Sequence, residues 1–375
     1  MNALPATTPP QRLEYLDGVR GWASLMVVLS HLWGQFARHN AAFYSAAPLR
    51  LVSNGHFAVL VFFVLSGTAL SLRFTRRPQP VALGWLMAAR YVRLVLPIAI
   101  TTLIIFILMK LQWYGSAEAA KVAHSPVFLG PRVGLSTSFV DAVRFSLFDV
   151  LFHYDAATTF NTSLWTMPIE FLGSLLVYAL LLGFSLAGLL RRGHRVAIAA
   201  LLTAALMVVS KPEAACFGAG YLIAEMLYAP PRALAVGRWA GVALVAIGGA
   251  LVALNGELDD ARGLVLAAGA VASIACWPAL RRLFSSRVSL WLGAISFPLY
   301  LSHVIVIDCG SRLFLEFVRS GMPLETATHV CAAIAIPACL LAARLLMPVE
   351  RWSIHWSRAV GNYRLRPRPL ATTPS

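Results

Sequence analysis

The amino-acid sequence predicts an all-α integral membrane protein, a polytopic bundle of about ten transmembrane helices. Of its 375 residues, 59% are hydrophobic and only 13% are charged, and the mean hydropathy is +0.72. A soluble protein of this size carries more charge on its surface. Apolar runs long enough to span a bilayer recur from end to end, and a helix satisfies its own backbone polar groups within lipid. We therefore expect a single membrane domain over residues 1–375.

The predicted spans follow one another along the whole chain. Residues 1–15 form a short polar tail without the basic start and small-residue cleavage site of a signal peptide, so we expect the first apolar run to be retained. The weaker, amphipathic segment 141–152 is expected at the interface or partly inside the protein. The ten spans cover residues 17–37, 55–74, 91–113, 164–189, 195–210, 213–229, 238–255, 262–280, 289–313 and 326–348.

The connections between the spans predict which side each end occupies. Every second connection is rich in arginine, as in "RFTRRPQP", "RRGHR", "PPRALAVGR" and "RRLFSSR", and so is the tail at 349–375. The other connections include "NGELDD" and a long mixed loop at 114–163. Because cytoplasmic loops carry the excess of arginine and lysine, we expect both termini in the cytoplasm. The expected location of the protein is the inner (plasma) membrane. An even number of spans agrees with this topology.

The charge distribution and the spacing of the cysteines argue against nucleic-acid binding, disulfides and a metal site. The formal net charge of +15 comes from short loops between apolar runs, so topology explains it and we expect no nucleic-acid partner. The five cysteines lie scattered in apolar runs without ligand spacing. We therefore expect buried small side chains in place of disulfides, and no bound metal. His153 and Asp155 of the long loop lack further ligands at a suitable spacing.

The opening apolar run, "LDGVRGWASLMVVLSHL", carries polar residues that a lipid-facing helix would avoid. Arg20 and His31 are eleven positions apart, which returns an α-helix to within about 20° of the same face. Asp17 and Ser24 fall on the same side. Ionisable residues within such a span are costly in lipid and usually mark function. The spacing therefore predicts that this face points into the bundle.

Two further titratable residues are expected at a similar depth in the outer half of the bilayer. At about 1.5 Å per residue, His31 lies about 16 Å beyond Arg20. His303 in "FPLYLSH" and Glu170 in "SLWTMPIEF" reach a comparable level on two other spans. Two histidines and a carboxylate at one depth suggest a shared buried site. The alternative is three unrelated polar residues, each satisfied locally.

Five motifs, taken together and in order, resemble those of the membrane acyltransferase-3 family. The motifs are "YLDGVRGWASLMVVLSH", "FFVLSGTALSLRF", "RYVRLVLP", "LWTMPIEF" and "SFPLYLSH", which run from residue 16 to about 303. Two positions depart from the family pattern. Ala89 stands where many members have a second arginine beside Arg90, and Pro97 comes one position later after Arg93 than in many members.

This resemblance implies transfer of an acyl group, with acetyl as the default, from acetyl-CoA or another acyl-CoA to a hydroxyl of a sugar or glycoconjugate. A hydroxyl is a poor nucleophile, and histidine is the commonest general base at neutral pH. We expect His31 to be that base. Glu170 would orient an imidazole or stabilise its charged form, and His303 would share the acceptor site or polarise the carbonyl. Arg20 would either bind the donor or pair with Asp17 and fix the helix.

The donor site is expected on the cytoplasmic side, because arginine binds phosphate well and coenzyme A carries phosphates. The alternative is ordinary topology and attraction to anionic membrane lipids. Ser66 and Gly67 form a small pair that would let a pantetheine arm or, more simply, a neighbouring helix approach closely. The expected donor-binding residues are Arg73, Arg76, Arg77, Arg90, Arg93 and Ser66.

Two other functions fit the same physical features. A transporter of an acylated sugar or lipid would also have ten helices with buried charge, and an inverted repeat would favour it. We found no internal repeat strong enough to support it. The other alternative is a non-catalytic scaffold that works with polysaccharide-assembly proteins.

Overall fold

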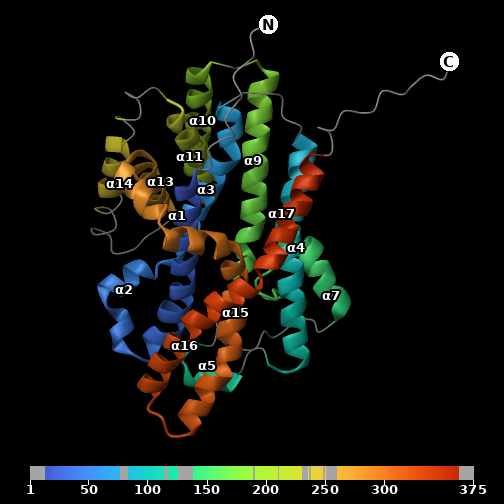
Figure 1. Ribbon diagram of the computed structural model, residues 1–375, viewed down its shortest axis with the longest axis vertical. Helices are drawn as coiled ribbons and strands as arrows, with labels where there is room; N and C mark the ends of the chain where they lie inside the picture. Colours follow the sequence, from blue (N-terminus) through green and yellow to red (C-terminus); the bar gives the residue numbers. More distant parts are fainter. Residues whose placement is uncertain are drawn as a thin grey trace, which may run out of the picture.

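The described part of the chain is built of helices (Figure 1). In this computed structural model the described residues are 13–76, 83–113, 117–125, 138–188, 191–209, 211–229, 238–247 and 260–362, with the single residues 235 and 250. These residues contain no β-strand. The prediction of an all-α fold is therefore confirmed for this part of the chain.

A helix occupies each predicted span. The first span is α1 (Glu14–Leu29) continued by η1 (Ser30–Phe36), and the described part of the seventh is helical over Arg238–Ile247. The others are α3 (Gly55–Arg76), α4 (Leu83–Lys110), α9 (Thr166–Leu186), α10 (Arg192–Val208), α11 (Pro212–Leu227), α13 (Asp260–Cys276), α15 (Arg287–Arg319) and α16 (Leu324–Leu345).

Shorter helices join the long ones. The predicted amphipathic segment forms α7 (Phe139–Arg144), η4 (Phe145–Asp149) and α8 (Val150–Phe152). Part of the predicted tail forms α17 (Met347–Asn362), which lies beside α4 (Figure 1). The remaining short helices are η2 (Ala37–His39), η3 (Ala42–Ser45), α2 (Ala47–Val52), α5 (Ala117–Val122), η5 (Thr162–Trp165) and α14 (Pro278–Phe284).

Five helices of the described residues are long and apolar enough to cross a membrane. They are α3, α4, α9 (with η5 before it), α15 and α16, and α13 with α14 would add a sixth span that is bent by 99°. Helices α1, α10 and α11 have only 16 or 17 residues. The protein is thus a helical membrane protein, while the number of ten spans and the sides of the termini stay predictions.

Glycine residues bring α1 and α15 into backbone contact. A Cβ atom at Gly21 would lie 2.4 Å from the Gly293 nitrogen, and one at Gly293 would lie 2.4 Å from the Asp17 carbonyl oxygen. Small residues permit such close packing of helices in membranes. A glycine also lets α3 pack closely against α11, because a Cβ at Gly67 would lie 2.3 Å from the Phe217 carbonyl oxygen. Close helix packing therefore explains Gly67 without a ligand.

The first span does not keep one helical geometry. After Leu29 the α-helix changes to the wider π-helix η1, which contains His31. π-turns inside α-helices occur frequently at functional sites. Ser24, which was expected on the same face, donates its hydroxyl to the carbonyl oxygen of Gly21 at 2.7 Å.

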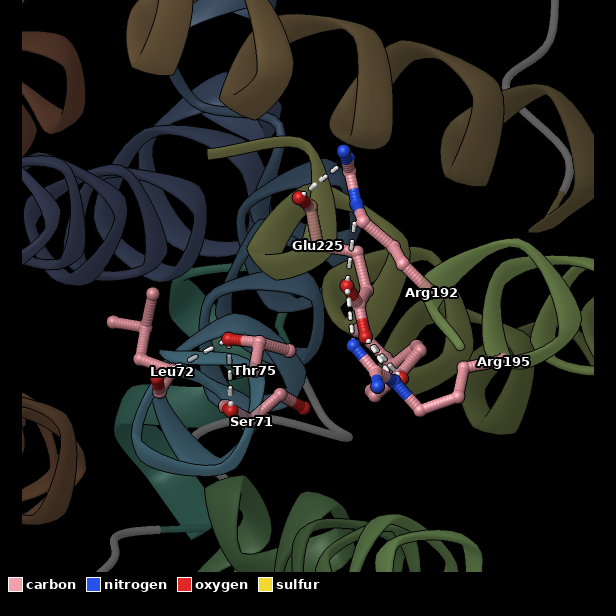
Figure 2. Close-up of polar contacts among 7 residues, drawn as sticks. Ser71, Leu72, Thr75, Arg192, Arg195 and Glu225 are labelled. Carbon is pink, nitrogen blue, oxygen red and sulfur yellow. Dashed lines mark hydrogen bonds and ion pairs between the residues drawn. The ribbon is translucent and has the colours of Figure 1, made fainter. Parts of the chain in front are cut away.

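A buried ion cluster joins α10 to α11 beside α3 (Figure 2). Arg195 Nε donates to Glu225 Oε1 at 2.9 Å, and the Tyr221 hydroxyl donates to the same oxygen at 2.5 Å. Arg192, one turn before Arg195, donates to the Glu225 carbonyl oxygen at 2.8 Å. Arg195 also lies 5.9 Å from the centre of the Phe74 ring on α3. The sequence placed the basic stretch "RRGHR" in a loop, whereas Arg195 is a buried helix residue that ties three helices together.

Replacing Gly293 by alanine tests the close contact of α1 with α15. The added methyl overlaps the backbone of Asp17, so the helices must separate, and we expect a loss of about 1–3 kcal/mol in unfolding free energy. Thermal unfolding in detergent measures this loss. Gly183→Ala is the matched control, since a Cβ there meets no atom within 4 Å. Equal unfolding midpoints for the two variants would contradict the contact.

The Glu225→Ala variant tests the ion cluster. It leaves the Arg195 guanidinium, with a side chain only 4% exposed, without the carboxylate. Breaking a buried pair on one side costs about 3–5 kcal/mol. We expect a clear drop in the thermal midpoint, while Glu316→Ala, at a side chain that is 68% exposed, changes stability by less than about 0.5 kcal/mol. A midpoint like that of Glu316→Ala would show that the cluster contributes little.

Candidate active site

A cavity of about 290 Å³ lies between α1, α3, α4, α9 and α15. Its apolar wall comes mostly from α3, with Phe297 of α15 and Met167 of α9. Seven polar side chains also face it, three of them arginines that the sequence had singled out. The polar lining residues are Arg20, Ser66, Arg90, Arg93, Thr166, Glu170 and Tyr300.

Each arginine of the cavity has a carboxylate partner. Arg20 Nη1 lies 3.7 Å from Asp17 Oδ1, one turn earlier on α1. Arg90 pairs with Glu170 of α9. Arg93 pairs with a carboxylate of α17. Pairing offsets the cost of holding these charges away from water, so the arginines can be in place before a ligand enters.

Glu170 is held by two neighbours of the cavity wall. Ser66 donates its hydroxyl to Glu170 Oε1 at 2.6 Å, and Arg90 donates to the same oxygen. Ser174, one turn later on α9, accepts from Arg90 Nε at 2.9 Å. The Glu170 carboxylate thus positions the Arg90 guanidinium. The expectation that Glu170 orients an imidazole or stabilises its charged form stays a prediction.

Arg93 is held by a residue that sequence reasoning missed. Its Nη1 donates to Glu350 Oε2 at 2.8 Å and to Ser353 Oγ at 3.2 Å, and its Nη2 donates to the other Glu350 oxygen. The guanidinium also lies 5.4 Å from the centre of the Phe297 ring. Glu350 was assigned to a basic tail at 349–375, where its charge gave no sign of a buried partner. In the structure, Glu350 belongs to a helix packed along α4.

His31 and His303 stack against each other inside the bundle. Their ring centres are 5.0 Å apart and the ring planes differ by 28°. His303 is fully buried. The depth argument placed both residues at one level on different spans, and the structure brings them into ring contact.

The hydrogen bonds of the pair define which nitrogen carries the proton. His303 Nδ1 lies 3.1 Å from the Leu299 carbonyl oxygen, and His31 Nδ1 lies 3.0 Å from Gln35 Oε1. Both partners are acceptors, so Nδ1 donates in each neutral ring and Nε2 keeps a lone pair. His303 Nε2 is buried and has no hydrogen-bond partner within the described residues. His303 Nε2 thus offers a lone pair that can accept a proton or a hydrogen bond from a ligand.

Tyr300 connects the cavity to the histidine pair. It lines the cavity, and its ring centre lies 5.9 Å from that of His303, one turn later on α15. Its hydroxyl donates to the Ser163 carbonyl oxygen at 2.5 Å and accepts from Thr166 at 2.7 Å. These bonds fix α15 against the start of α9. Tyr300 stood in a motif of the sequence, but its spacing did not reveal this role.

Some predicted donor contacts fall outside what the structure describes. Arg73 and Arg76 belong to α3, but their side chains are not among the described ones, and Arg77 lies outside the described residues. The five cysteines, all of them among the described residues, form no disulfide. The described residues contain no group of three or more histidine, cysteine or acidic side chains that could hold a metal ion.

A Glu350→Ala variant tests the role of α17. It removes the partner of a guanidinium whose side chain is only 25% exposed, and a hydrogen bond to a charged group contributes about 1.5–3 kcal/mol. We expect the thermal midpoint in detergent to fall accordingly. Glu325→Ala serves as the control because that side chain is 64% exposed. If both variants melt alike, the Arg93–Glu350 pair does not hold the helices together.

Comparison with known proteins identifies the family. A family model described as an acyltransferase domain matches residues 13–344. The O-acetyltransferase PaAT-1 of Phomopsis amygdali is 27% identical over 203 residues, which cover 46% of this chain. The match covers 40% of that relative, so the chain aligns with less than half of its length. No solved structure matches the chain significantly. The chain belongs to the acyltransferase-3 family, as its five motifs predicted.

Proposed function

We propose that this protein is a membrane O-acyltransferase that moves an acyl group from acyl-CoA to a hydroxyl of a sugar or glycoconjugate. The observation that carries the proposal is the stacked His31–His303 pair beside an arginine-lined cavity, in a chain of this family. The relative named above is an O-acetyltransferase, which favours acetyl as the acyl group. The inner membrane and polysaccharide-assembly proteins as partners belong to the same proposal.

The histidine pair supplies the base that this reaction needs. Nε2 of His31 takes the proton of the acceptor hydroxyl while the hydroxyl oxygen attacks the thioester carbonyl carbon. The tetrahedral intermediate then collapses, the carbon–sulfur bond breaks, and the leaving thiolate receives the proton from the His31 imidazolium. The products are an ester and free CoA. His303, whose Nε2 also carries a lone pair, accepts a hydrogen bond from a second hydroxyl of the acceptor and holds the acceptor in place.

This tautomer of His303 disfavours one of the expected roles. Polarising the thioester carbonyl needs a donor, and the Nδ1 proton of His303 already goes to the Leu299 carbonyl oxygen. A neutral Nε2 can only accept. The hydrogen bonds of His303 therefore support the other expected role, which is to help bind the acceptor.

The arginine-lined cavity suits the arm of the donor. Its volume of about 290 Å³ is at the lower end for sites that take a drug-sized ligand, so it suits a pantetheine arm better than a whole coenzyme A. Arg20, Arg90 and Arg93 have the donor groups that bind phosphate, and their carboxylate partners hold them at the cavity before the donor enters. The arm would enter from the predicted cytoplasmic side and carry the thioester toward Tyr300 and the histidines.

Transfer from radiolabelled acetyl-CoA in membranes tests the proposal. Membranes with the wild-type protein should label a sugar-containing product above vector membranes. His31→Ala should lower the initial rate about 10²–10⁴-fold, because the general base is lost. His303→Ala should raise the KM for the acceptor more than it lowers kcat, since His303 binds a hydroxyl of the acceptor other than the one that reacts.

The matched control is His194→Ala, at an exposed position of α10 away from the cavity. Equal amounts of folded protein are confirmed by detergent gel filtration. Full activity of His31→Ala would rule out His31 as the base. Wild-type membranes that label nothing from any acyl-CoA, with isolated cell-surface sugars added, would contradict the O-acyltransferase function.

A further inference from the structure

A second group of basic side chains lies at the bend between α13 and α14, and none of its members lines the arginine-lined cavity. The Arg281 guanidinium of α14, a helix packed against α1 and α13, lies 5.5 Å from the centre of the Tyr15 ring on α1. The Arg238 guanidinium, on the seventh predicted span, lies 4.9 Å from the centre of the Trp277 ring, which stands at the bend itself. Both guanidinium groups are close enough to the Cys276 thiol to act on its charge. The fold thus gathers two cations and two aromatic rings at one place.

These two arginines differ from the arginines described above, because they have no carboxylate partner. Each of the three cavity arginines, and the buried arginine of the ion cluster, is paired with an acidic residue. Within the described part of the chain, Arg238 and Arg281 form no ion pair, and Arg281 donates its Nε to a backbone carbonyl oxygen of α13 at 2.5 Å. Glu14 is exposed, and the stretches 1–12 and 230–237 contain two more arginines and no acidic residue. Partly buried cations without counter-ions are costly, so this group favours the binding of an anion.

Three buried polar atoms of the group have no hydrogen-bond partner among the described residues. They are the Tyr15 hydroxyl, Trp277 Nε1 and Arg238 Nε. Tyr15 as a whole is only 4% exposed. Buried polar atoms are nearly always satisfied by protein, by water or by a bound ion. All three of these groups can donate a hydrogen bond, and donors beside two cations match the oxygen atoms of a phosphate.

The predicted topology places the group at the level of the lipid headgroups. The connections "PPRALAVGR" and "RRLFSSR", which contain Arg238 and Arg281, are both expected on the cytoplasmic side, and Tyr15 ends a tail that is expected there as well. Trp239, whose ring centre lies 6.2 Å from that of Trp277, is 61% exposed. Tryptophan rings prefer the interface between lipid and water. Basic pockets between helices on this side of a membrane bind anionic lipid headgroups.

We propose that Tyr15, Arg238, Trp277 and Arg281 form a binding site for the phosphate of an anionic phospholipid. The two guanidinium groups supply the charge, and the hydroxyl and the indole nitrogen donate hydrogen bonds to the phosphate oxygens. The bound lipid ties α1 to the seventh span and to the bend between α13 and α14. This inference does not depend on the proposed function, since it needs only a protein that lies in a membrane. The phosphates of coenzyme A have the same chemistry, so the experiment distinguishes the two sources.

Three variants and a matched control test the site. Arg238→Gln and Arg281→Gln each remove one cation and keep a polar side chain. Tyr15→Phe removes only the hydroxyl that has no partner. Arg282→Gln is the control, because it removes the next arginine of the same helix, which is exposed.

The experiment measures the thermal midpoint of the protein in detergent, stripped of lipid, as phosphatidylglycerol, phosphatidylcholine or coenzyme A is added. A ligand that binds only the folded state raises the midpoint with its concentration, which yields a dissociation constant. We expect phosphatidylglycerol to stabilise the wild type and Arg282→Gln alike. Arg238→Gln and Arg281→Gln should each bind it about fivefold more weakly, as for the loss of one basic contact at a membrane surface. Tyr15→Phe should also weaken binding, yet keep or raise the midpoint without lipid, because an unsatisfied buried hydroxyl is gone.

Three outcomes would overturn the site. The first is an unchanged dissociation constant for phosphatidylglycerol in Arg238→Gln and Arg281→Gln, or an equal loss of affinity in Arg282→Gln, which would reduce the effect to general surface charge. The second is equal stabilisation by phosphatidylcholine, which has no net charge. The third is stabilisation by coenzyme A alone that these variants lose, which would assign the group to a soluble phosphate ligand. If Arg281→Gln yields no folded protein, Arg238→Gln and Tyr15→Phe decide.

Discussion

The backbone contact between α1 and α15 is the constraint on which the candidate site depends. Gly21 and Gly293 allow the two helices to touch without intervening side chains. From that contact onward the two helices run in the same direction, and each has a histidine ten residues, or about three turns, further along. The stacking of His31 on His303 thus follows from helix packing about three turns away from the rings.

Charge balance is the second feature that shapes the molecule. The cavity has three guanidinium groups, and each is paired with a carboxylate on the same helix or on another one. Away from the cavity, Glu225 is the carboxylate partner of the buried Arg195. Buried charges of this kind are tolerated only with partners, so the pairs connect α4 to α9, α4 to α17 and α10 to α11. The groups suited to bind an anionic donor therefore also hold the helices in register.

Sequence reasoning predicted correctly the features that depend on a single helix, namely its place in the chain and the depth of its residues. Hydropathy located a helix in each predicted span, and rise per residue put His31 and His303 at one level. Sequence reasoning did not find partners that are far apart in the chain. Depth did not reveal Arg90 as the ion-pair partner of Glu170, because depth does not say which side chain lies across the interface. Glu350 stood among basic residues in an apparent tail, and only packing of α17 against α4 reveals its role.

The link between Arg93 and Glu350 has a consequence for how the protein is made. The two residues are 257 positions apart, and chains are synthesised from the N-terminus at about 5–20 residues per second. Helix α4 is thus available for membrane insertion roughly 10–50 s before α17 leaves the ribosome. During that interval the Arg93 guanidinium lacks its final carboxylate. The nascent protein therefore passes through a stage in which anionic lipid headgroups or membrane chaperones can bind this arginine, and synthesis of the last helix ends it.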